Sequence, residues 1–319
     1  MTFRILGTGS ALPGRVVTND ELSAFLDTSD EWIFSRTGIK ERRVCADETL
    51  DDLAEAAASR ALEAASVAAA QVDLVICATS TADHLMPAEA CAVAQRLGIR
   101  CAAFDVSAAC AGFVLALDVA DGYIARGRAQ HVLIVACEQM SRVLDWADRS
   151  TCVLFGDGAA AAVLGPCAEK NPLAMRFSTT PEVGTLEVAG MAGTSPFLVG
   201  TRPASVLRMD GRRVFRFGVA AICDEVEALA SEAGVGIGDI DHFVFHQANE
   251  RILAAAVKRL GIEDARVART LRETGNISSA CIPLALDRLA RAGKLRPGDL
   301  IAMVGFGAGL DIGACLLRW

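Results

Sequence analysis

The chain has 319 residues, of which 52% are hydrophobic, 22% charged and 5% aromatic, so it can bury a sizeable core in one large or two medium domains. Its net charge of -8, from 31 basic and 39 acidic residues, excludes a general nucleic-acid binder, and no apolar run reaches the ~18 residues of a membrane span. Eleven cysteines without a Cys-x-x-Cys spacing exclude a zinc ribbon and a redox dithiol, and their odd number and the lack of a signal peptide predict a cytoplasmic protein with reduced thiols.

Short apolar runs, typical of buried strands, alternate with capped amphipathic segments, typical of helices, in the first half of the chain. Strands are expected at residues 3–7, 74–78, a run ending at 106, 131–136 and 151–155, with a turn at 7–9. Helices are expected from a cap at Thr18 through residue 26, from a cap at 28–31 over Trp32, and at 50–65, 87–97 and 113–124.

The second half repeats this alternation after a loop-rich stretch at residues 166–203. Helices are expected at 214–233, 250–260 and 282–292, strands at 242–245, 300–304 and 312–317, a polar loop at 272–279 and a glycine-rich turn at 305–309. Strands that alternate with helices in this way predict a layered α/β protein.

Three short motifs occur twice, in the same order. RLGI stands at 96–99 and 259–262, LALD at 115–118 and 284–287, and FGxG at 155–158 and 306–309. The repetition predicts a duplicated α/β unit with a pseudo-two-fold axis, and we expect a first half at residues 1–170 and a second at 171–319. Aligning the two LALD runs places Cys110 opposite Ser279, so a site between the halves is expected.

The residues around Cys110 point to a nucleophile. The cysteine lies between a predicted strand and a predicted helix, where free backbone N–H groups and the helix dipole favour a thiolate. A small buried core cysteine is the alternative interpretation of the same residue.

Two further polar residues are expected near Cys110. His246 ends a predicted strand, at the sheet edge where α/β proteins bind ligands, and the duplication places Asn276 at the same edge. The backbone N–H groups of the glycine-rich turn at 305–309 can face an oxyanion. Cysteine, histidine and asparagine on loops of one sheet edge predict acyl-transfer chemistry.

Four motifs carry a resemblance to a known family. They are DVSAACAGF at 105–113, HQAN at 246–249, GNISSA at 275–280 and GFGAG at 305–309. The chain resembles β-ketoacyl-acyl-carrier-protein (ACP) synthase III, a thiolase-fold condensing enzyme, over its whole length, including TSDEWIFSRTGIKERR and DRSTCVLFGDGAAAAVLG. The resemblance implies a five-layer αβαβα fold, with the nucleophilic cysteine in the first half and the histidine and asparagine in the second.

The resemblance also implies a mechanism that initiates fatty acid synthesis. Cys110 takes an acyl group from acyl-CoA, and a malonyl group on ACP then loses CO2 and attacks that acyl group. His246 and Asn276 stabilise the enolate, while the backbone N–H groups of Cys110 and of Gly307 or Ala308 hold an oxyanion. Loss of CO2 makes the carbon nucleophile, so no metal or redox cofactor is expected.

The family's binding residues match positions in this chain. Those for CoA are Trp32, Arg36, Arg149 and Asn249. Those for the acyl group are Met140, Phe155, Leu207, Phe306 and Met86, the last supplied across a homodimer interface. A basic patch that would steer the acidic carrier protein comprises Arg212, Arg213, Arg216, Arg251, Lys258 and Arg259.

Departures from the family pattern leave the primer open. Met86 stands where phenylalanine is frequent, Asp311-Ile312 where Thr-Trp is frequent, and Ile277 follows Asn276 in place of threonine. We expect an acetyl primer, with a glutaryl thioester for a biotin precursor or a polyketide starter as alternatives. Two different functions also fit these residues: a same-fold acyltransferase that forms no carbon–carbon bond, and a degenerate subunit that only binds CoA or ACP.

Overall fold

Two β-sheets organise the chain, and the computed structural model describes them over residues 2–190 and 205–319. The strand order is β1-β7-β6-β4-β5 in the first sheet and β11-β12-β13-β8 in the second. The first contains β1 (Thr2–Ala11), β4 (Leu74–Ala78), β5 (Ala102–Val106), β6 (Val132–Gln139) and β7 (Asp157–Cys167). The second contains β8 (Ala174–Thr179), β11 (His242–Phe245), β12 (Leu300–Gly307) and β13 (Asp311–Arg318).

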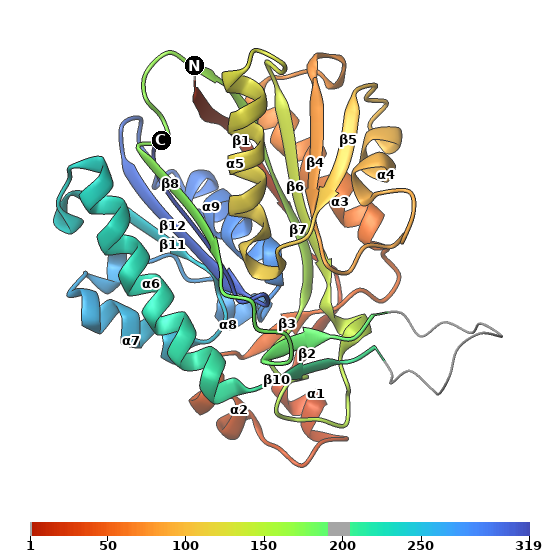
Figure 1. Ribbon diagram of the computed structural model, residues 1–319. Helices are drawn as coiled ribbons and strands as arrows, with labels where there is room; N and C mark the ends of the chain where they lie inside the picture. Colours follow the sequence, from red (N-terminus) through yellow and green to blue (C-terminus); the bar gives the residue numbers. More distant parts are fainter. Residues whose placement is uncertain (1, 191–204) are drawn as a thin grey trace.

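Helices form three layers around these sheets (Figure 1). Helices α5 (Gly112–Ala125) and α9 (Cys281–Arg291) lie between the sheets, α3 (Leu50–Ala65) and α4 (Glu89–Arg96) cover the outer face of the first, and α6 (Gly211–Ala233) and α7 (Glu250–Leu260) cover that of the second. The expected five-layer αβαβα order is therefore confirmed.

Alternating strand residues explain the layers. Ile76 and Ile134 face the central cluster around α5 and α9, whereas Val75 and Val135 pack with α3 and α4. In the second sheet Val244 faces the central cluster, while its neighbours pack against α6 and α7. Because both faces of each sheet are buried, the strands are continuous apolar runs.

The two sheets repeat one topology. In the first, β1 is antiparallel to β7, β7 to β6, and β6 is parallel to β4. In the second sheet, β8 is antiparallel to β13, β13 is antiparallel to β12, and β12 is parallel to β11, so the four strands repeat the pattern of the first sheet. A parallel bridge between Phe243 and Val267 stands where the first sheet has its β4–β5 pair. The duplication inferred from the motifs is therefore present in the fold.

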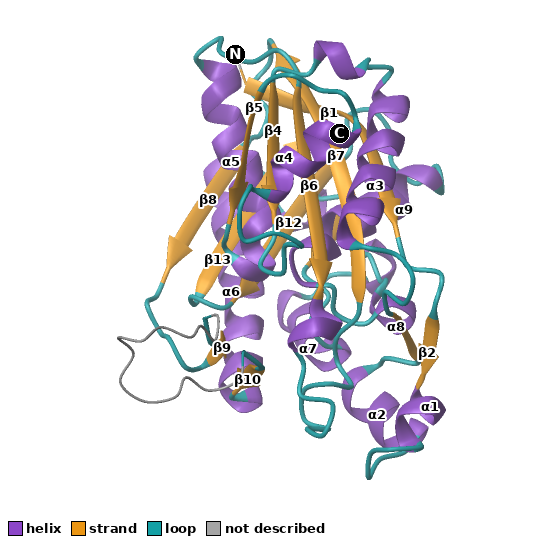
Figure 2. Ribbon diagram, turned by 90° about the vertical axis from the view of Figure 1, so that its right-hand side faces the viewer, coloured by secondary structure: helices purple, strands orange, loops and turns teal. Residues whose placement is uncertain are grey.

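Smaller elements gather at one end of the sheets (Figures 1 and 2). They are β2 (Val16–Thr18), α1 (Asn19–Ser23), α2 (Asp30–Thr37), β3 (Glu41–Arg43), β9 (Leu186–Val188), β10 (Leu207–Met209) and α8 (Leu271–Thr274). Thr18 and Ser29 cap α1 and α2, as their sequences predict. Single 3-10 turns lie at Ala69–Gln71, Ala109–Ala111, Met140–Val143, Ile237–Asp239, Asp264–Arg266 and Ser278–Ala280.

Two local predictions in the first half of the chain were wrong. The turn expected at residues 7–9 is part of β1, because its glycines let the strand approach α3: a Cβ on Gly7 would come within 2.3 Å of the Ala65 nitrogen. The strand expected at 151–155 is a turn, and β7 begins at Asp157. The Val153 carbonyl accepts a hydrogen bond from Arg42 and the Leu154 carbonyl accepts one from the Asn276 backbone, so this segment pairs with the Asn276 loop and not with a strand of the sheet.

The stretch at 166–203 is less irregular than expected, since it contains β8 and β9, while its residues 191–203 lie outside the described part. Of the helices in the described ranges, none is both long enough and apolar enough to cross a membrane.

Candidate active site

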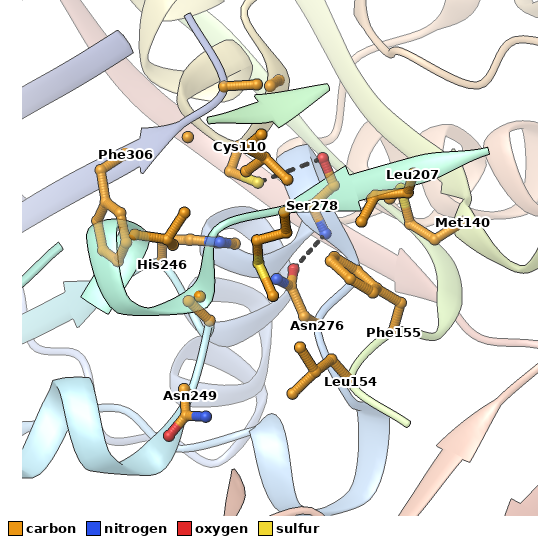
Figure 3. A pocket seen from close by; sticks show the side chains of 18 of the residues that line it. Cys110, Met140, Leu154, Phe155, Leu207, His246, Asn249, Asn276, Ser278 and Phe306 are labelled. Atoms are coloured by element: carbon orange, nitrogen blue, oxygen red, sulfur yellow. Dashed lines mark hydrogen bonds between the residues drawn. The ribbon is translucent and has the colours of Figure 1, made fainter. Parts of the chain in front are cut away.

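A cavity of about 590 Å³ lies between the two halves, and most of the predicted site residues line it. Cys110 follows β5, His246 follows β11, and Asn276 precedes α9. In Figure 3 the side chains of these three residues point toward one another. The structure therefore brings together, around one space, three residues that are far apart in the sequence.

The turn that carries Cys110 has a structural copy in the other half. Ala109 and Ser278 have positive φ angles of 43° and 48°, and α5 and α9 begin two residues after Cys110 and Ser279, respectively. A Cβ on Gly112 would lie 3.6 Å from the Ser279 Cβ, so the two turns meet at the pseudo-two-fold axis. The alignment of the LALD motifs predicts this pairing correctly.

Strand β12 passes very close to Cys110. A Cβ on Gly307 would lie 2.9 Å from the Cys110 nitrogen, and one on Gly305 would lie 3.0 Å from its carbonyl oxygen. Only glycine permits this approach. The predicted oxyanion groups, at Cys110, Gly307 and Ala308, consequently lie together on the cavity wall.

The protonation of Cys110 differs from the sequence-based prediction. Its side chain is buried, and burial raises the pKa of the thiol to about 12, against the lowering effect of a hydrogen bond with Ser278. The Cys110 Sγ lies 3.5 Å from the Ser278 Oγ. At neutral pH the free protein therefore holds a thiol, because desolvation outweighs the helix N-terminus that we expected to favour a thiolate.

His246 is a neutral imidazole in this site. It is 1% exposed, and burial lowers its pKa to about 3. Its ring stands edge-on to Phe306, with 5.2 Å between the ring centroids. Its backbone N–H donates to the Val304 carbonyl at 2.9 Å, which fixes the residue at the end of its strand.

Asn276 is held so that its amide nitrogen is free to donate. Its backbone N–H donates to the Leu154 carbonyl at 2.8 Å, and its own carbonyl accepts from Gly156 at 3.0 Å. Its Oδ1 accepts the backbone N–H of Ser278 at 2.8 Å. With Oδ1 engaged in this way, Nδ2 is the atom that can bind an oxygen in the cavity.

Apolar side chains form another wall of the cavity. Met140, Phe155 and Leu207 are buried and lie together on one side of Cys110 in Figure 3, while Phe306 lies beside His246. Met86 is the exception among the predicted acyl-pocket residues: it is 79% exposed and does not line the cavity of its own chain. Its contact with a partner's acyl group stays a prediction.

The predicted CoA residues line the same cavity. Trp32 and Arg36 lie on α2, and Arg149 lies in the loop before β7. The guanidinium carbons of Arg36 and Arg149 lie 4.5 and 5.1 Å from the centroid of the Trp32 ring. Asn249 caps α7 with its Oδ1 and donates from Nδ2 to the Arg36 carbonyl at 3.1 Å. Asn249 therefore joins the two helices of the cavity wall.

The predicted basic patch lies on α6 and α7, and all six of its side chains are exposed. Arg213 pairs with Glu182, and Arg259 pairs with Asp224 at 3.1 Å. Arg212 and Arg251 make no ion pair with the described residues, and each is next in the chain to a residue that lines the cavity, Gly211 and Ile252 respectively. These two are the members best placed to meet a partner at the cavity.

Two polar residues next to Cys110 were missed in the sequence. Ser278 contacts its sulfur, and Glu138 of β6 is fully buried behind it. The sequence could have indicated Glu138, because it stands at the end of the apolar run IVACEQ. Burying a carboxyl group costs free energy, so a glutamate in a buried strand is a candidate for a functional residue. Nothing local to Ser278 distinguishes it from an ordinary turn serine.

Known proteins agree with this fold and site. The 3-Oxoacyl-[acyl-carrier-protein (ACP)] synthase III family model matches residues 104–181, and its C-terminal counterpart matches 230–319. A β-ketoacyl-[acyl-carrier-protein] synthase III from Chelativorans is 46% identical, over 99% of this chain and 98% of the relative. One from Desulfitobacterium hafniense is 45% identical, over 99% and 97%.

Solved structures give the same result. The 3-oxoacyl-ACP synthase III of Aquifex aeolicus superposes with a TM-score of 0.93 at 40% identity, covering 99% of this chain and 100% of that one. The priming β-ketosynthase of the R1128 polyketide pathway superposes with a TM-score of 0.91 at 42% identity, covering 99% and 96%. The chain belongs to the β-ketoacyl-ACP synthase III family, thiolase-fold condensing enzymes that act as acyltransferases.

Proposed function

We propose that the protein condenses an acyl-CoA primer with malonyl-ACP, through an acyl thioester on Cys110, and so initiates fatty acid synthesis. The observation that carries the proposal is the convergence of one buried thiol with two neutral donors, His246 and Asn276, in a single cavity. That set suits a reaction that first stores an acyl group and then stabilises an enolate.

The first step is transfer of the acyl group. The Cys110 sulfur attacks the thioester carbon of acyl-CoA, and the CoA sulfur leaves. The carbonyl oxygen becomes an oxyanion, which the backbone N–H groups of Cys110 and of Gly307 or Ala308 are positioned to bind. Trp32, Arg36 and Arg149 would hold the nucleotide part of CoA at the same cavity.

The second step is decarboxylation and carbon–carbon bond formation. His246 and the amide of Asn276 donate to the thioester oxygen of malonyl-ACP as CO2 leaves. Because burial keeps His246 uncharged, the site stabilises developing negative charge without binding the malonyl carboxylate tightly. Loss of CO2 supplies the carbanion, so the proposed reaction requires no metal or redox cofactor.

We also propose that the protein is a cytoplasmic homodimer with an acetyl primer. All eleven cysteines are free thiols, which supports a reducing compartment. Leu85 and Met86 form an adjacent exposed apolar pair, at 73% and 79% exposure, which supports a covering partner. The likeness to a polyketide priming ketosynthase supports a polyketide starter as the alternative primer.

Two substitutions separate the two steps. Cys110→Ser should abolish the acyl-enzyme, measured by intact mass after incubation with acetyl-CoA. Asn276→Ala should still form the acyl-enzyme but release CO2 from malonyl-ACP at least about a hundredfold more slowly, by analogy with the loss of one oxyanion donor. Equal losses at both steps in Asn276→Ala would contradict the assigned role.

The same assay tests the other enzyme class. An acyltransferase that passes its acyl group to an oxygen or nitrogen would load Cys110 yet release no CO2 from malonyl-ACP. A subunit that only binds CoA or ACP would show no cysteine with selectively fast iodoacetamide labelling among the eleven. Either result would replace the proposed condensation.

A further inference from the structure

Three carboxyl groups meet outside the active-site cavity, and the proposed reaction gives them no role. They belong to Asp51 in the first turn of α3, Asp83 in the loop after β4, and Glu89 at the start of α4. One oxygen from each lies within 4.8 Å of the other two, and none of the three residues lines the cavity. Helices α3 and α4 both cover the outer face of the first sheet (Figure 1), so three separate segments supply the cluster.

Buried oxygens without partners distinguish this cluster from an ordinary acidic surface. Glu89 is 0% exposed, and its Oε2 accepts the Asp83 backbone N–H at 2.9 Å. Its Oε1 is buried and has no hydrogen-bond partner among the described residues, and the same holds for Oδ1 of Asp51. Burial and the adjacent Asp51 carboxyl group raise the pKa of Glu89 to about 8. Because a buried carboxylate oxygen without a partner costs free energy, these two oxygens lack a positive ligand.

The neighbouring cations do not balance the negative charge of the cluster. Arg142 pairs with Asp83. Arg96 lies 3.5 Å from Asp51, but it also pairs with two further carboxylates of α3, at 3.0 and 2.8 Å. The His84 Nε2 lies 3.7 Å from Asp51, on a side chain that is 46% exposed. Five carboxylates therefore surround two guanidinium groups and one imidazole, so at least two negative charges are uncompensated when all five are ionised.

The cluster is accessible from one side. The side chains of Asp51 and Asp83 are 16% and 18% exposed, while Glu89 closes the inner end. Each Asp83 oxygen accepts one hydrogen bond, from Arg142 or from the Asp51 backbone, and keeps a second lone pair. Carboxylate oxygens are the ligands that Ca²⁺ and Mg²⁺ prefer, and water fills their remaining coordination positions.

We propose that Asp51, Asp83 and Glu89 bind one divalent cation of the oxygen-preferring class, Ca²⁺ or Mg²⁺. The ion would lie between Oδ1 of Asp51 and Oε1 of Glu89, with an oxygen of Asp83 beside them. It takes no part in the condensation, and its binding is independent of the function proposed above.

The bound ion would restrain the segment between two of its ligands. The Asp51 backbone N–H donates to Oδ2 of Asp83 at 3.1 Å, and Asp83 in turn donates to Glu89, so both ends of the segment already meet α3. Between them lie Leu85 and Met86, which are 73% and 79% exposed. Because a place in a partner's acyl pocket is predicted for Met86, the ion would order a part of the proposed dimer interface.

The test is direct binding of each ion to the whole protein after treatment with a chelator. Calorimetric titration and thermal unfolding with Ca²⁺ or Mg²⁺ would compare the wild type, Glu89→Gln, Asp51→Asn and Glu55→Gln. Glu55→Gln is the matched control: it removes the same charge from a carboxylate of α3 that pairs with Arg96 and is no member of the cluster.

The wild type and Glu55→Gln should each bind one ion per chain, with a Kd at or below about 1 mM for at least one of the two cations, and the midpoint of thermal unfolding should rise until the site is full. Glu89→Gln and Asp51→Asn should bind at least about tenfold more weakly and lose that rise. Without an ion, Glu89→Gln should be at least as stable as the wild type, because a neutral amide replaces a buried acid. Its loss of binding is then no loss of folding.

Two results would overturn the cation site. If Glu89 holds a proton in place of an ion, neither cation binds the wild type or changes its unfolding midpoint. Equal binding by the wild type and both cluster variants would place the ion elsewhere on the protein. Hydrogen exchange tests the restraint separately: the peptide containing residues 84–88 should gain protection on addition of the ion in the wild type and in Glu55→Gln, and unchanged protection in a protein that binds the ion would contradict the restraint.

Discussion

At the scale of residues, burial determines the protonation of the groups in the candidate active site. The identities of Cys110, His246 and Asn276 are visible in the sequence because each lies in a distinctive motif. Their protonation is not visible there, since it depends on what packs around them. Glu138 and Ser279 are 141 positions apart, and only the folded chain brings them into contact.

The lowered pKa of His246 predicts an acid-labile fold. Its folded-state pKa of about 3 lies below the ordinary 6.5, so the unfolded chain binds a proton that the native chain does not between those values. The free energy of unfolding should therefore be unaffected above pH 6.5 and fall as the pH drops toward 3, by up to roughly 4 kcal/mol from this residue.

Chemical denaturation of the wild type and His246→Gln across pH 4 to 8 would measure that contribution. The variant should lose less stability on acidification than the wild type. Parallel curves for the two proteins would show that His246 takes up its proton at the same pH in the native and the unfolded chain, which would contradict the lowered pKa.

At the scale of elements, close approach explains the glycines that look like turn residues in the sequence. Gly305 and Gly307 were predicted in a turn, but both belong to β12, where they let its backbone pass Cys110. Gly7 and Gly9 likewise belong to β1 and let it approach α3. A single sequence cannot separate these cases, because a glycine required by a neighbour's backbone and one required by a turn look alike. The strands 74–78 and 242–245, by contrast, were predicted correctly from their apolar runs.

Gly307→Ala should damage the site through this contact. The added Cβ would lie 2.9 Å from the Cys110 nitrogen, so β12 or the nucleophile must move. We expect a loss of about 1–3 kcal/mol in unfolding free energy and roughly a hundredfold slower acyl loading.

Gly122→Ala is the matched control for that change. Gly122 lies within α5, and a Cβ there meets nothing within 4 Å. It should stabilise the helix by about 0.5–1 kcal/mol and leave acyl loading unchanged. Thermal unfolding and single-turnover loading of both variants would decide, and normal loading by Gly307→Ala would contradict the role given to β12.

At the scale of the whole molecule, the repeated motifs predict the architecture because duplication leaves its order in the chain. The layers, the shared axis and the position of the cavity all follow from two copies of one unit facing each other. Contacts between chains cannot be inferred from the duplication. Met86 lies outside the cavity of its own chain, and its predicted place in the acyl pocket requires a partner subunit.

The basic residues of α6 and α7 give a prediction at this scale. Arg212→Glu with Arg251→Glu should lower kcat/KM for malonyl-ACP about tenfold and leave acetyl-CoA loading within about twofold, since the patch would steer an acidic protein. Added salt should reduce the difference from the wild type. Lys294→Glu, a charge reversal on an exposed residue beyond the C-terminal end of α9, is the control. Equal effects of the two sets of reversals on malonyl-ACP would contradict docking at this patch.

The most direct test of condensation through Cys110 is the intact mass of the wild-type protein through one cycle. After acetyl-CoA we predict a mass increase of one acyl group, located on the peptide that contains Cys110. After malonyl-ACP that increase should disappear, with release of one CO2 for each β-ketoacyl-ACP formed. An acyl group on any other residue, or one that malonyl-ACP leaves in place, would contradict the proposed function.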